Sequence, residues 1–187
     1  PLHITGSKLS GIHYEMRIAS AQIKSCLLLA GIYAHGSTSI IEPSPCRDHT
    51  ERMLEGFGCS IERGGSSGMI TISGEGQLSG IEIQVPGDIS SAAFFMVAAA
   101  ISENSEIKII QVGLNPTRTG IVSLLRLMNV DIEISNERTI GGEPIGDIKV
   151  ISSAVTGISV PLDLVPLAID EFPIICIAAA CANGTTI

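Results

Sequence analysis

Hydrophobic and polar positions follow two different periods along this chain. Short stretches alternate with the period of two that a half-buried strand requires, and longer apolar runs rich in alanine and leucine follow them. The alternating stretches are residues 12–16 and 81–85. The longer runs, which we expect to be helices, are residues 23–34 and 92–101. The pattern therefore predicts a strand followed by a helix, twice.

The segments that follow the two predicted helices also resemble each other. β-branched segments predict strands at 37–41 and 107–112, and proline loops then enter second helices at 48–57 and 119–128. The order strand, helix, strand, helix, strand, strand indicates an α/β (α+β) fold with sheets backed by helices. The remaining expected strands are residues 59–62, 69–73, 130–134 and 147–151.

The two units are copies of one sequence pattern. A shift of 71 residues without a gap places Ser91 on Ser20 and Arg118 on Arg47. A third copy begins at a shift of 148 residues and stops after its first helix. Each copy of such a repeat must bury its apolar face against its neighbours, so the repeat predicts the architecture better than any single motif.

Pro86 and Gly87 interrupt the pattern between the first two copies. We place the domain boundary there, which assigns residues 1–85 to one domain and 86–187 to the next. Since the third copy stops early, we expect the sequence to be part of a larger protein.

The composition narrows the classes of function. The net charge is −8 and lysine and arginine do not cluster, which argues against a nucleic-acid surface. A few aimed arginines and helix N-termini can still hold a small anionic substrate. The longest apolar stretches are too short or too charged to cross a bilayer, so we expect no membrane contact.

The five cysteines and four histidines suggest no special chemistry. The cysteines form no CxxC pair, which favours free thiols in a reducing cytoplasm. The histidines show no metal-ligand spacing, so we expect no metal.

The first candidate site is the helix start Ser20, Ala21, Gln22 and Lys24. A helix N-terminus offers unpaired N–H groups and partial positive charge, to which the serine hydroxyl and the glutamine amide add polar contacts. For an isolated motif of this kind an ordinary N-cap is the better explanation, because caps are so common. In the second copy, Ser90 or Ser91 is the expected cap.

The second candidate is the proline loop around Ser44 and Arg47, which enters the second helix. A cation at a helix start gains nothing from the helix dipole and requires an anionic partner. Considered alone, this motif is better explained by a salt bridge from Arg47 to Asp48 or Glu51 than by a substrate. Residues 115–119, its second-copy counterpart, are interpreted as a turn and a helix entry.

The third candidate is Asp170, which lies in the most apolar part of the chain. A carboxylate buried at a helix start is costly unless it is paired or functional, and it could act as a general base. Alternatively, Asp170 could cap the helix that Pro173 helps to begin.

Taken together, these motifs resemble the 5-enolpyruvylshikimate-3-phosphate synthase family in its class II bacterial form. The resemblance extends over the whole chain, and its three most specific segments are residues 20–24, 47–51 and 115–118. It implies a two-domain, inside-out α/β barrel built from β-α-β-α-β-β units. Residues 1–85 would be the last unit of the N-terminal domain, and 86–187 the first one and a half units of the C-terminal domain.

The resemblance also implies an activity, which is the transfer of the enolpyruvyl group of phosphoenolpyruvate to the 5-hydroxyl of shikimate 3-phosphate. No cofactor or metal is implied. Ser20 and the Ala21 backbone would hold the shikimate phosphate, Gln22 would touch both substrates, and Arg47 would add charge. Asp170 would accept the hydroxyl proton. Ser44 and Lys24 are further possible contacts at the same site.

Two alternatives remain open at this point. The first is the sister enolpyruvyl transferase that acts on UDP-N-acetylglucosamine, and the second is a non-catalytic repeat scaffold. For the main hypothesis we expect a cytoplasmic monomer in the shikimate pathway to aromatic amino acids, inactive as this segment alone. Glyphosate tolerance is implied by class only.

Overall fold

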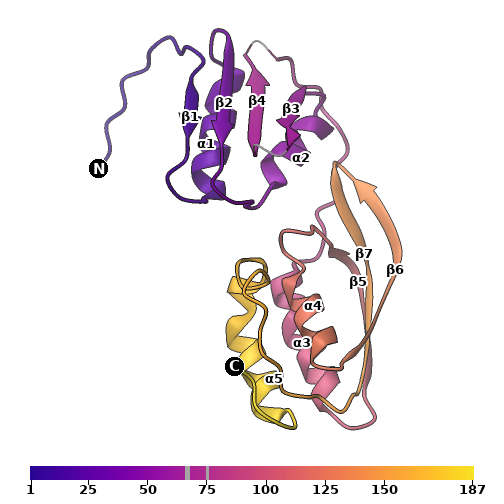
Figure 1. Ribbon diagram of the computed structural model, residues 1–187. Coiled ribbons are helices and arrows are strands. Elements are labelled where there is room, and N and C mark those ends of the chain that lie inside the picture. The colour runs from indigo at the N-terminus through magenta and orange to yellow at the C-terminus, as the bar shows by residue number, and fades with distance from the viewer. Residues whose placement is uncertain (66–67, 75) are drawn as a thin grey trace. The chain divides into compact units, whose positions relative to one another are not determined.

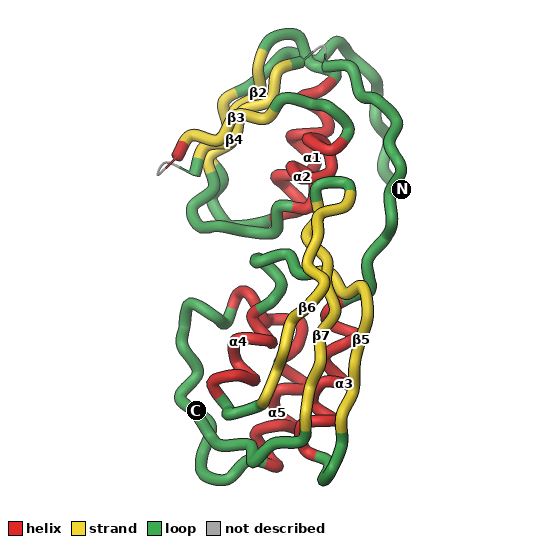
Figure 2. Tube along the Cα trace, turned by 90° about the vertical axis from the view of Figure 1, so that its right-hand side faces the viewer, coloured by secondary structure: helices red, strands yellow, loops and turns green. Residues whose placement is uncertain are grey.

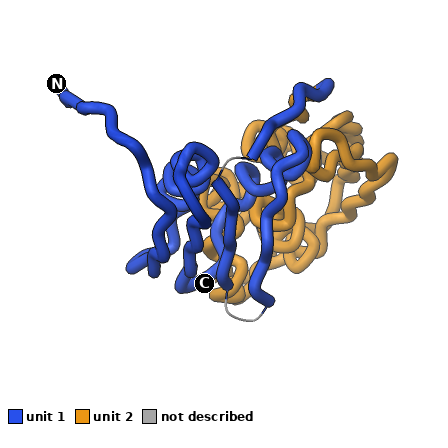
Figure 3. The backbone as a smooth tube through the Cα atoms, turned by 90° about the horizontal axis from the view of Figure 1, so that it is seen from above, with its two compact units in different colours: residues 1–82 blue, residues 83–187 orange. Residues whose placement is uncertain are grey.

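The computed structural model describes residues 1–65, 68–74 and 76–187. The chain divides into two compact units, residues 1–82 and 83–187 (Figure 3). The predicted boundary was placed three residues later, at 85/86.

The first unit follows the predicted order strand, helix, strand, helix, strand, strand (Figure 1). Its sheet has the strand order β1-β2-β4-β3, in which β1 is parallel to β2 and the other neighbours are antiparallel. Leu28, Ile40 and Ile72 are fully buried at the core between helices and sheet. The elements are β1 (His13–Glu15), α1 (Ala21–Ile32), β2 (Ser37–Ile41), α2 (His49–Gly56), β3 (Ile61–Gly64) and β4 (Met69–Ser73).

The second unit packs its helices on one face of a three-stranded antiparallel sheet of order β5-β7-β6 (Figure 2). Met96, Leu124 and Ile148 are fully buried in the core that these helices and the sheet enclose. The elements are α3 (Ile89–Ile101), β5 (Glu106–Gly113), α4 (Gly120–Leu127), β6 (Asp131–Ile140), β7 (Glu143–Ile151), the 3₁₀ helix η2 (Pro166–Glu171) and α5 (Phe172–Cys181).

The strand predicted at 81–85 is wrong. These residues lie in the described part of the chain and form no strand, and Val85 is exposed. Pairing is reduced to one parallel bridge between Gly87 and Val112, with the Gly87 amide 2.7 Å from the Gln111 carbonyl. Pro86 has no N–H to contribute to a ladder, which explains why pairing begins only after it.

The third copy of the repeat is visible in the backbone pairing. The amide of Gly157 donates to the Asn183 carbonyl at 2.8 Å, and that of Ile187 donates to the Ile158 carbonyl at 2.9 Å. A segment before helix α5 therefore runs beside the segment after it, as β1 runs beside β2 around α1. This arrangement confirms that the third copy repeats the start of the first.

The predicted N-cap of α3 is also wrong. Asp88, not Ser90 or Ser91, caps this helix, and its carboxylate accepts a hydrogen bond from the Ser91 amide at 2.8 Å. Ser20, as predicted, caps α1. The shift between the two caps is 68 residues, whereas α2 and α4 keep the shift of 71.

Gly36 and Asn104, which both have positive φ after the first helix, still differ by 68 residues. The shift therefore changes from 68 to 71 between these positions and the second helices, in the stretch where the pairing of β5 with β7 shifts between Ile109 and Val112. Burial supports this assignment, since Lys24 and Leu28 are buried in α1, and Ala92 and Met96 are buried in α3. Within the first helices, the ungapped alignment of Ser20 with Ser91 is therefore not a structural equivalence.

Candidate functional site

The start of α1 presents the first group of predicted site residues. Ser20 has extended backbone angles, and its hydroxyl accepts a hydrogen bond from the Ile23 amide at 3.4 Å. Ser20 and Ala21 are half-buried and Gln22 is exposed. The cap interpretation of Ser20 is thus correct, and it leaves the Gln22 side chain accessible at a helix N-terminus, where anions are favoured.

Lys24 lies one turn below this helix start and is fully buried. Its ammonium contacts the carboxylate of Glu51 at 2.7 Å and that of Glu42 at 3.0 Å. Burial by itself lowers the pKa of Lys24, but the hydrogen bonds to Glu51 and Glu42 outweigh it and raise the pKa above its ordinary value. Lys24 is therefore a charged side chain inside the unit.

The same lysine ties the Arg47 loop to helix α1. Its ammonium lies 3.4 Å from the Cys46 carbonyl oxygen, and the Cys46 thiol donates to Glu42 at 3.0 Å. A hydrogen bond of 2.6 Å between the Ser25 and Thr50 hydroxyls adds a second link between α1 and α2. These contacts fix the loop directly before Arg47.

Arg47 itself is half-buried, and Ser44 on the same loop is exposed. The two carboxylates considered as its partners each contact another cation. Asp48 pairs with Arg52 at 2.9 Å, and Glu51 pairs with Lys24. The structure thus brings Ser20, Ala21, Gln22 and the Arg47 loop into one unit.

Asp170 belongs to the second unit, near the end of η2. The expectation that it is buried is wrong, because 46% of its side chain is exposed. The cap interpretation is wrong as well, since Glu171 occupies the N-cap position of α5 and makes no capping hydrogen bond there. The buried carboxylate of this segment is Glu171, which is 3% exposed.

A cluster that sequence reasoning assigned only to structure surrounds this segment. The Arg118 Nη2 atom lies 2.7 Å from the Ser90 hydroxyl, 3.4 Å from Asp88 Oδ1 and 3.8 Å from Asp170 Oδ2. The Ser90 hydroxyl in turn donates to Glu171 Oε1. The signal that could have found the cluster was present in the repeat, which places Arg118 on Arg47.

The loop before Arg118 is the turn that the sequence predicted. The buried Asn115 side chain accepts from the Thr117 amide at 2.9 Å and from the Thr117 hydroxyl at 2.7 Å. The Arg118 amide donates to the Asn115 carbonyl at 2.8 Å. This Asx turn fixes the backbone from which the arginine projects.

Gly120 sets the distance between α4 and η2. A β-carbon at this position would lie 2.6 Å from the Leu167 carbonyl carbon and 2.9 Å from the Ala168 amide nitrogen. Both are backbone atoms, so no side-chain movement could relieve the clash. The backbone three residues before Asp170 is therefore seated directly on the first turn of α4.

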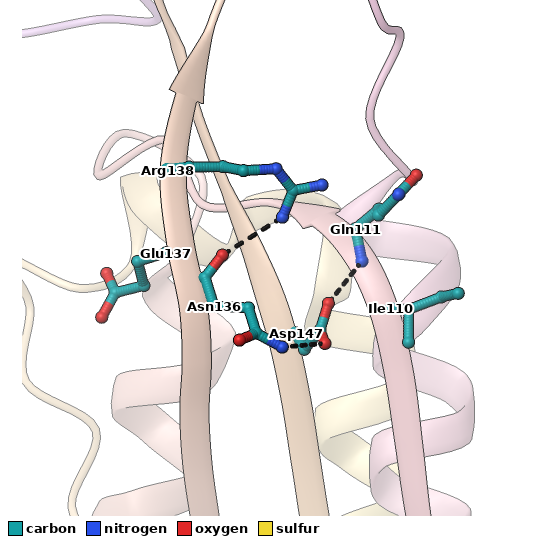
Figure 4. A pocket seen from close by; sticks show the side chains of 6 residues that line it. All are labelled: Ile110, Gln111, Asn136, Glu137, Arg138 and Asp147. Atoms are coloured by element: carbon teal, nitrogen blue, oxygen red, sulfur yellow. Dashed lines mark hydrogen bonds between the residues drawn. The ribbon is translucent and has the colours of Figure 1, made fainter.

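A separate hollow of about 510 Å³ lies on the second sheet and contains none of the predicted site residues (Figure 4). Asp147 at its base accepts from the Gln111 amide at 3.0 Å and the Asn136 side chain at 2.8 Å, and it pairs with Lys108 at 3.0 Å. Gln111 and Asn136 have positive φ and lie where the pairing of β5 and of β6 with β7 shifts. Asp147 thus holds two β-bulges, one in each outer strand.

The described residues contain no group of three or more His, Cys, Asp or Glu side chains that could hold a metal ion. Within the same part of the chain, no helix has both the length and the apolar character needed to span a membrane. All five cysteines are free thiols.

Comparison with known proteins identifies the family. The family model described as EPSP synthase (3-phosphoshikimate 1-carboxyvinyltransferase) matches residues 1–187. A protein of that name from Alkalilimnicola ehrlichii is 56% identical over the whole chain, and one from Hydrogenovibrio crunogenus is 54% identical. The chain spans 42% and 43% of the length of these two relatives.

Solved structures agree with this match. The EPSP synthase from Acinetobacter baumannii superposes with a TM-score of 0.91 at 54% identity, over 97% of this chain and 41% of that one. The enolpyruvyl transferase NikO from Streptomyces tendae superposes with a TM-score of 0.71 over 97% of this chain and 44% of its own. At 17% identity that likeness shows the fold alone. The mixed helix and strand repeat, the whole-chain family match and the close superposition together show that this chain belongs to the EPSP synthase (3-phosphoshikimate 1-carboxyvinyltransferase) family.

Proposed function

We propose that the full-length protein containing this chain transfers the enolpyruvyl group of phosphoenolpyruvate to the 5-hydroxyl of shikimate 3-phosphate and releases phosphate. The observation that carries the proposal is the family match over all of residues 1–187, at identities above 50% to proteins named for this reaction. In this proposal residues 1–85 close the N-terminal domain and 86–187 begin the C-terminal one.

The start of α1 is proposed to hold the phosphate of shikimate 3-phosphate. The Ser20 hydroxyl and the Ala21 amide supply donors at a helix N-terminus, and Arg47 supplies a full positive charge. The exposed Gln22 amide can donate to one substrate and accept from the other. Ser44, exposed on the Arg47 loop, is a further candidate contact.

Lys24 is proposed to act behind this site. Its buried ammonium contacts Glu51, Glu42 and the Cys46 carbonyl, so its contacts favour holding the Arg47 loop against α1 over touching substrate.

Asp170 is proposed as the base in the second unit. Its carboxylate is partly exposed and can therefore reach a substrate hydroxyl. The proton of the 5-hydroxyl passes to Asp170 while the hydroxyl oxygen forms a bond to C2 of phosphoenolpyruvate and C3 takes up a proton. The phosphate then leaves with its bridging oxygen, and C3 gives up a proton as the double bond returns. Residues of this chain are assigned to the first proton transfer only.

The test uses full-length protein with Asp170→Asn and, as a control, Asp163→Asn at an exposed aspartate of the same unit. We expect Asp170→Asn to lower kcat by about 100- to 10,000-fold with unchanged thermal unfolding, because a general base contributes about that much. Asp163→Asn should keep the activity of the unmodified protein. Full activity of the Asp170→Asn protein would remove the catalytic assignment.

A second measurement separates the classes of function. Titration calorimetry with shikimate 3-phosphate should give a heat of binding that Gln22→Ala reduces. Absence of binding, together with no enolpyruvyl transfer, would favour a non-catalytic scaffold, and turnover of UDP-N-acetylglucosamine would favour the sister transferase.

We also propose that the protein works as a monomer in the cytoplasm. The free thiols of the described cysteines are compatible with a reducing compartment. Light scattering coupled to size-exclusion chromatography tests the monomer, and a stable dimer mass would contradict it.

A further inference from the structure

The two repeats place an arginine opposite a helix start in equivalent positions. Arg47 and Arg118 each precede the second helix of their unit, at the shift of 71 residues that relates α2 to α4. The caps of α1 and α3 are related by a shift of 68, so the structural counterpart of Gln22 is Ser90. In the second unit this counterpart is the hydroxyl that Arg118 contacts at 2.7 Å.

In the second unit, carboxylates of the protein itself contact the arginine and the helix start. In the first unit, the helix start and Arg47 form the proposed phosphate site. In the second, Arg118 lies 3.8 Å from Asp170, and Ser90 donates to Glu171. The position that takes a substrate anion in one repeat is therefore occupied in the other by the segment that carries the proposed base.

We propose that Arg118 is a positioning residue, which orients the Asp170 carboxylate for proton abstraction while Ser90 and Asp88 fix its guanidinium. The inference rests on the proposed function, because it concerns the base of that reaction. Arg118 takes no part in bond making, and its charge acts through Asp170.

The surroundings of Asp170 explain why it requires such support. It lies in a 3₁₀ helix of six residues that is interrupted by the non-helical backbone of Ala168, and nearly half of its side chain is exposed. Short 3₁₀ helices have poor hydrogen-bond geometry and do not fix a side chain well. An ion pair with a largely buried arginine restricts the carboxylate to fewer orientations.

The guanidinium is itself held firmly. The Asn115 turn fixes its backbone, and only 18% of its side chain is exposed. Asp88 remains ionised beside it. Burial raises the pKa of Asp88, but hydrogen bonds from Ser91 and from the Ser90 amide, with the charge of Arg118, outweigh this and lower the pKa.

The test compares Arg118→Met, Arg118→Lys and the control Arg126→Met in full-length protein. Arg126 is an arginine of the same unit that donates to the Ile132 carbonyl at 3.0 Å. We expect Arg118→Met to lower kcat about 10- to 100-fold, as misplacement of a reacting group does, with the KM for shikimate 3-phosphate changed less than about 2-fold. Arg118→Lys should recover part of the loss, and Arg126→Met should leave kcat unchanged.

A double-mutant cycle with Asp170→Asn distinguishes positioning from a structural role. If Arg118 acts through Asp170, Arg118→Met should lower kcat little further in the Asp170→Asn background. An equal fold-loss in both backgrounds, or an unchanged kcat in Arg118→Met, would overturn the proposal.

Two further measurements keep the outcomes separate. If Arg118→Met does not fold, Ser90→Ala is measured in its place. This variant removes the 2.7 Å contact between the Ser90 hydroxyl and the Arg118 guanidinium. An unchanged kcat in Ser90→Ala counts against the proposal. If the unmodified protein forms no product from phosphoenolpyruvate and shikimate 3-phosphate, the proposed function fails. Activity of the unmodified protein with an unaffected Arg118→Met variant defeats only the positioning role.

Discussion

The Arg47 loop and the Arg118 loop enter equivalent helices but are anchored by different chemistry. Behind the first loop lies a buried ion pair, in which Lys24 contacts Glu51 and Glu42. The structural counterparts of Lys24 and Glu51 are Ala92 and Val122, both buried and apolar. The same fold therefore accommodates either buried charged side chains or apolar side chains at these equivalent positions.

This difference indicates that the fold does not require the buried charges for its stability. Removing two charges from water costs several kcal/mol for each, and apolar residues of similar volume often stabilise a fold as well or better. The lysine also reaches the Cys46 carbonyl beside Arg47, a contact that alanine could not make. We infer that the first unit keeps the ion pair because it fixes its arginine loop.

Lys24→Met is the largest expected disruption of this comparison. It leaves Glu51 buried without its cation, which should lower the free energy of unfolding by about 3–5 kcal/mol. Chemical denaturation of the full-length protein measures the change. Lys149→Met is the matched control, because the Lys149 pair with Glu106 is partly exposed on both sides, and such pairs contribute about 1 kcal/mol or less.

The double variant Lys24→Met/Glu51→Leu sharpens the test by giving the first unit the apolar solution of the second. We expect it to recover most of the stability but not the affinity for the proposed substrate, shikimate 3-phosphate. Recovery of both would show that the lysine has no role in placing Arg47. In the unmodified protein, the contribution of the Lys24–Glu51 pair to the free energy of unfolding should be complete up to about pH 10.4, the ordinary lysine pKa. It should be lost as the pH rises through the raised pKa of Lys24.

The Cys46 thiol offers a chemical probe of the same anchor. Burial, followed by its hydrogen bond to Glu42, raises the pKa of Cys46 to about 11 from the ordinary 9.0. At pH 8 the thiolate fraction should therefore be about 100-fold lower in the folded protein than in urea. Iodoacetamide labelling followed by mass spectrometry measures this ratio. Equal labelling rates in both conditions would contradict the burial of Cys46 in the loop before Arg47. Glu42→Gln should increase the rate at which Cys46 is labelled in the folded protein.

The sheets of the two units differ as well, and this difference should have the smallest effect. In the first unit β2 and β4 pair without a shift from Ser37 to Ile41, whereas in the second Asp147 holds two bulges. Hydrogen bonds from Asn136 and Gln111, with Lys108, lower the pKa of Asp147 to about 2. Its stabilising contribution should be complete above about pH 3.9, its unfolded pKa, and be lost as the pH falls through 2.

Thermal unfolding between pH 5 and 2 tests this effect by comparison with Asp147→Asn. The variant should be less stable at neutral pH, and its melting temperature should depend less on pH in the acid range. Parallel acid curves for the two proteins would exclude Asp147 as the source.

The sequence predicted the elements that depend on local signals. Alternation and β-branching located β2 and β4 with the observed bounds, and Ser20 was found as a cap because it directly precedes an apolar helix. Asp88 was missed because Ser90 and Ser91 offered the same signal three residues later. The choice among adjacent cap residues depends on the path of the preceding chain, and here backbone pairing begins at Gly87, directly before Asp88.

The candidate site was less predictable, because its determining contacts are not local. Lys24 lies near the start of the apolar run 23–34, but its charge predicts a solvent-facing position, and only the fold shows that it is fully buried. Arg118 reaches Asp170 across 52 positions of sequence, so only the fold reveals the ion pair. Asp170 was expected to be buried from its apolar neighbours, yet the acidic residue that the core encloses is the adjacent Glu171.

Because Gly120 has no side chain, the backbone that leads to the proposed base can lie directly against the start of α4. Any added methyl group would lift Leu167 and Ala168, and with them the short stretch that leads to Asp170. The equivalent position of the first repeat holds His49, so the start of α2 accommodates a full side chain. A library built to diversify the two repeats should therefore keep position 120 constant while it varies position 49.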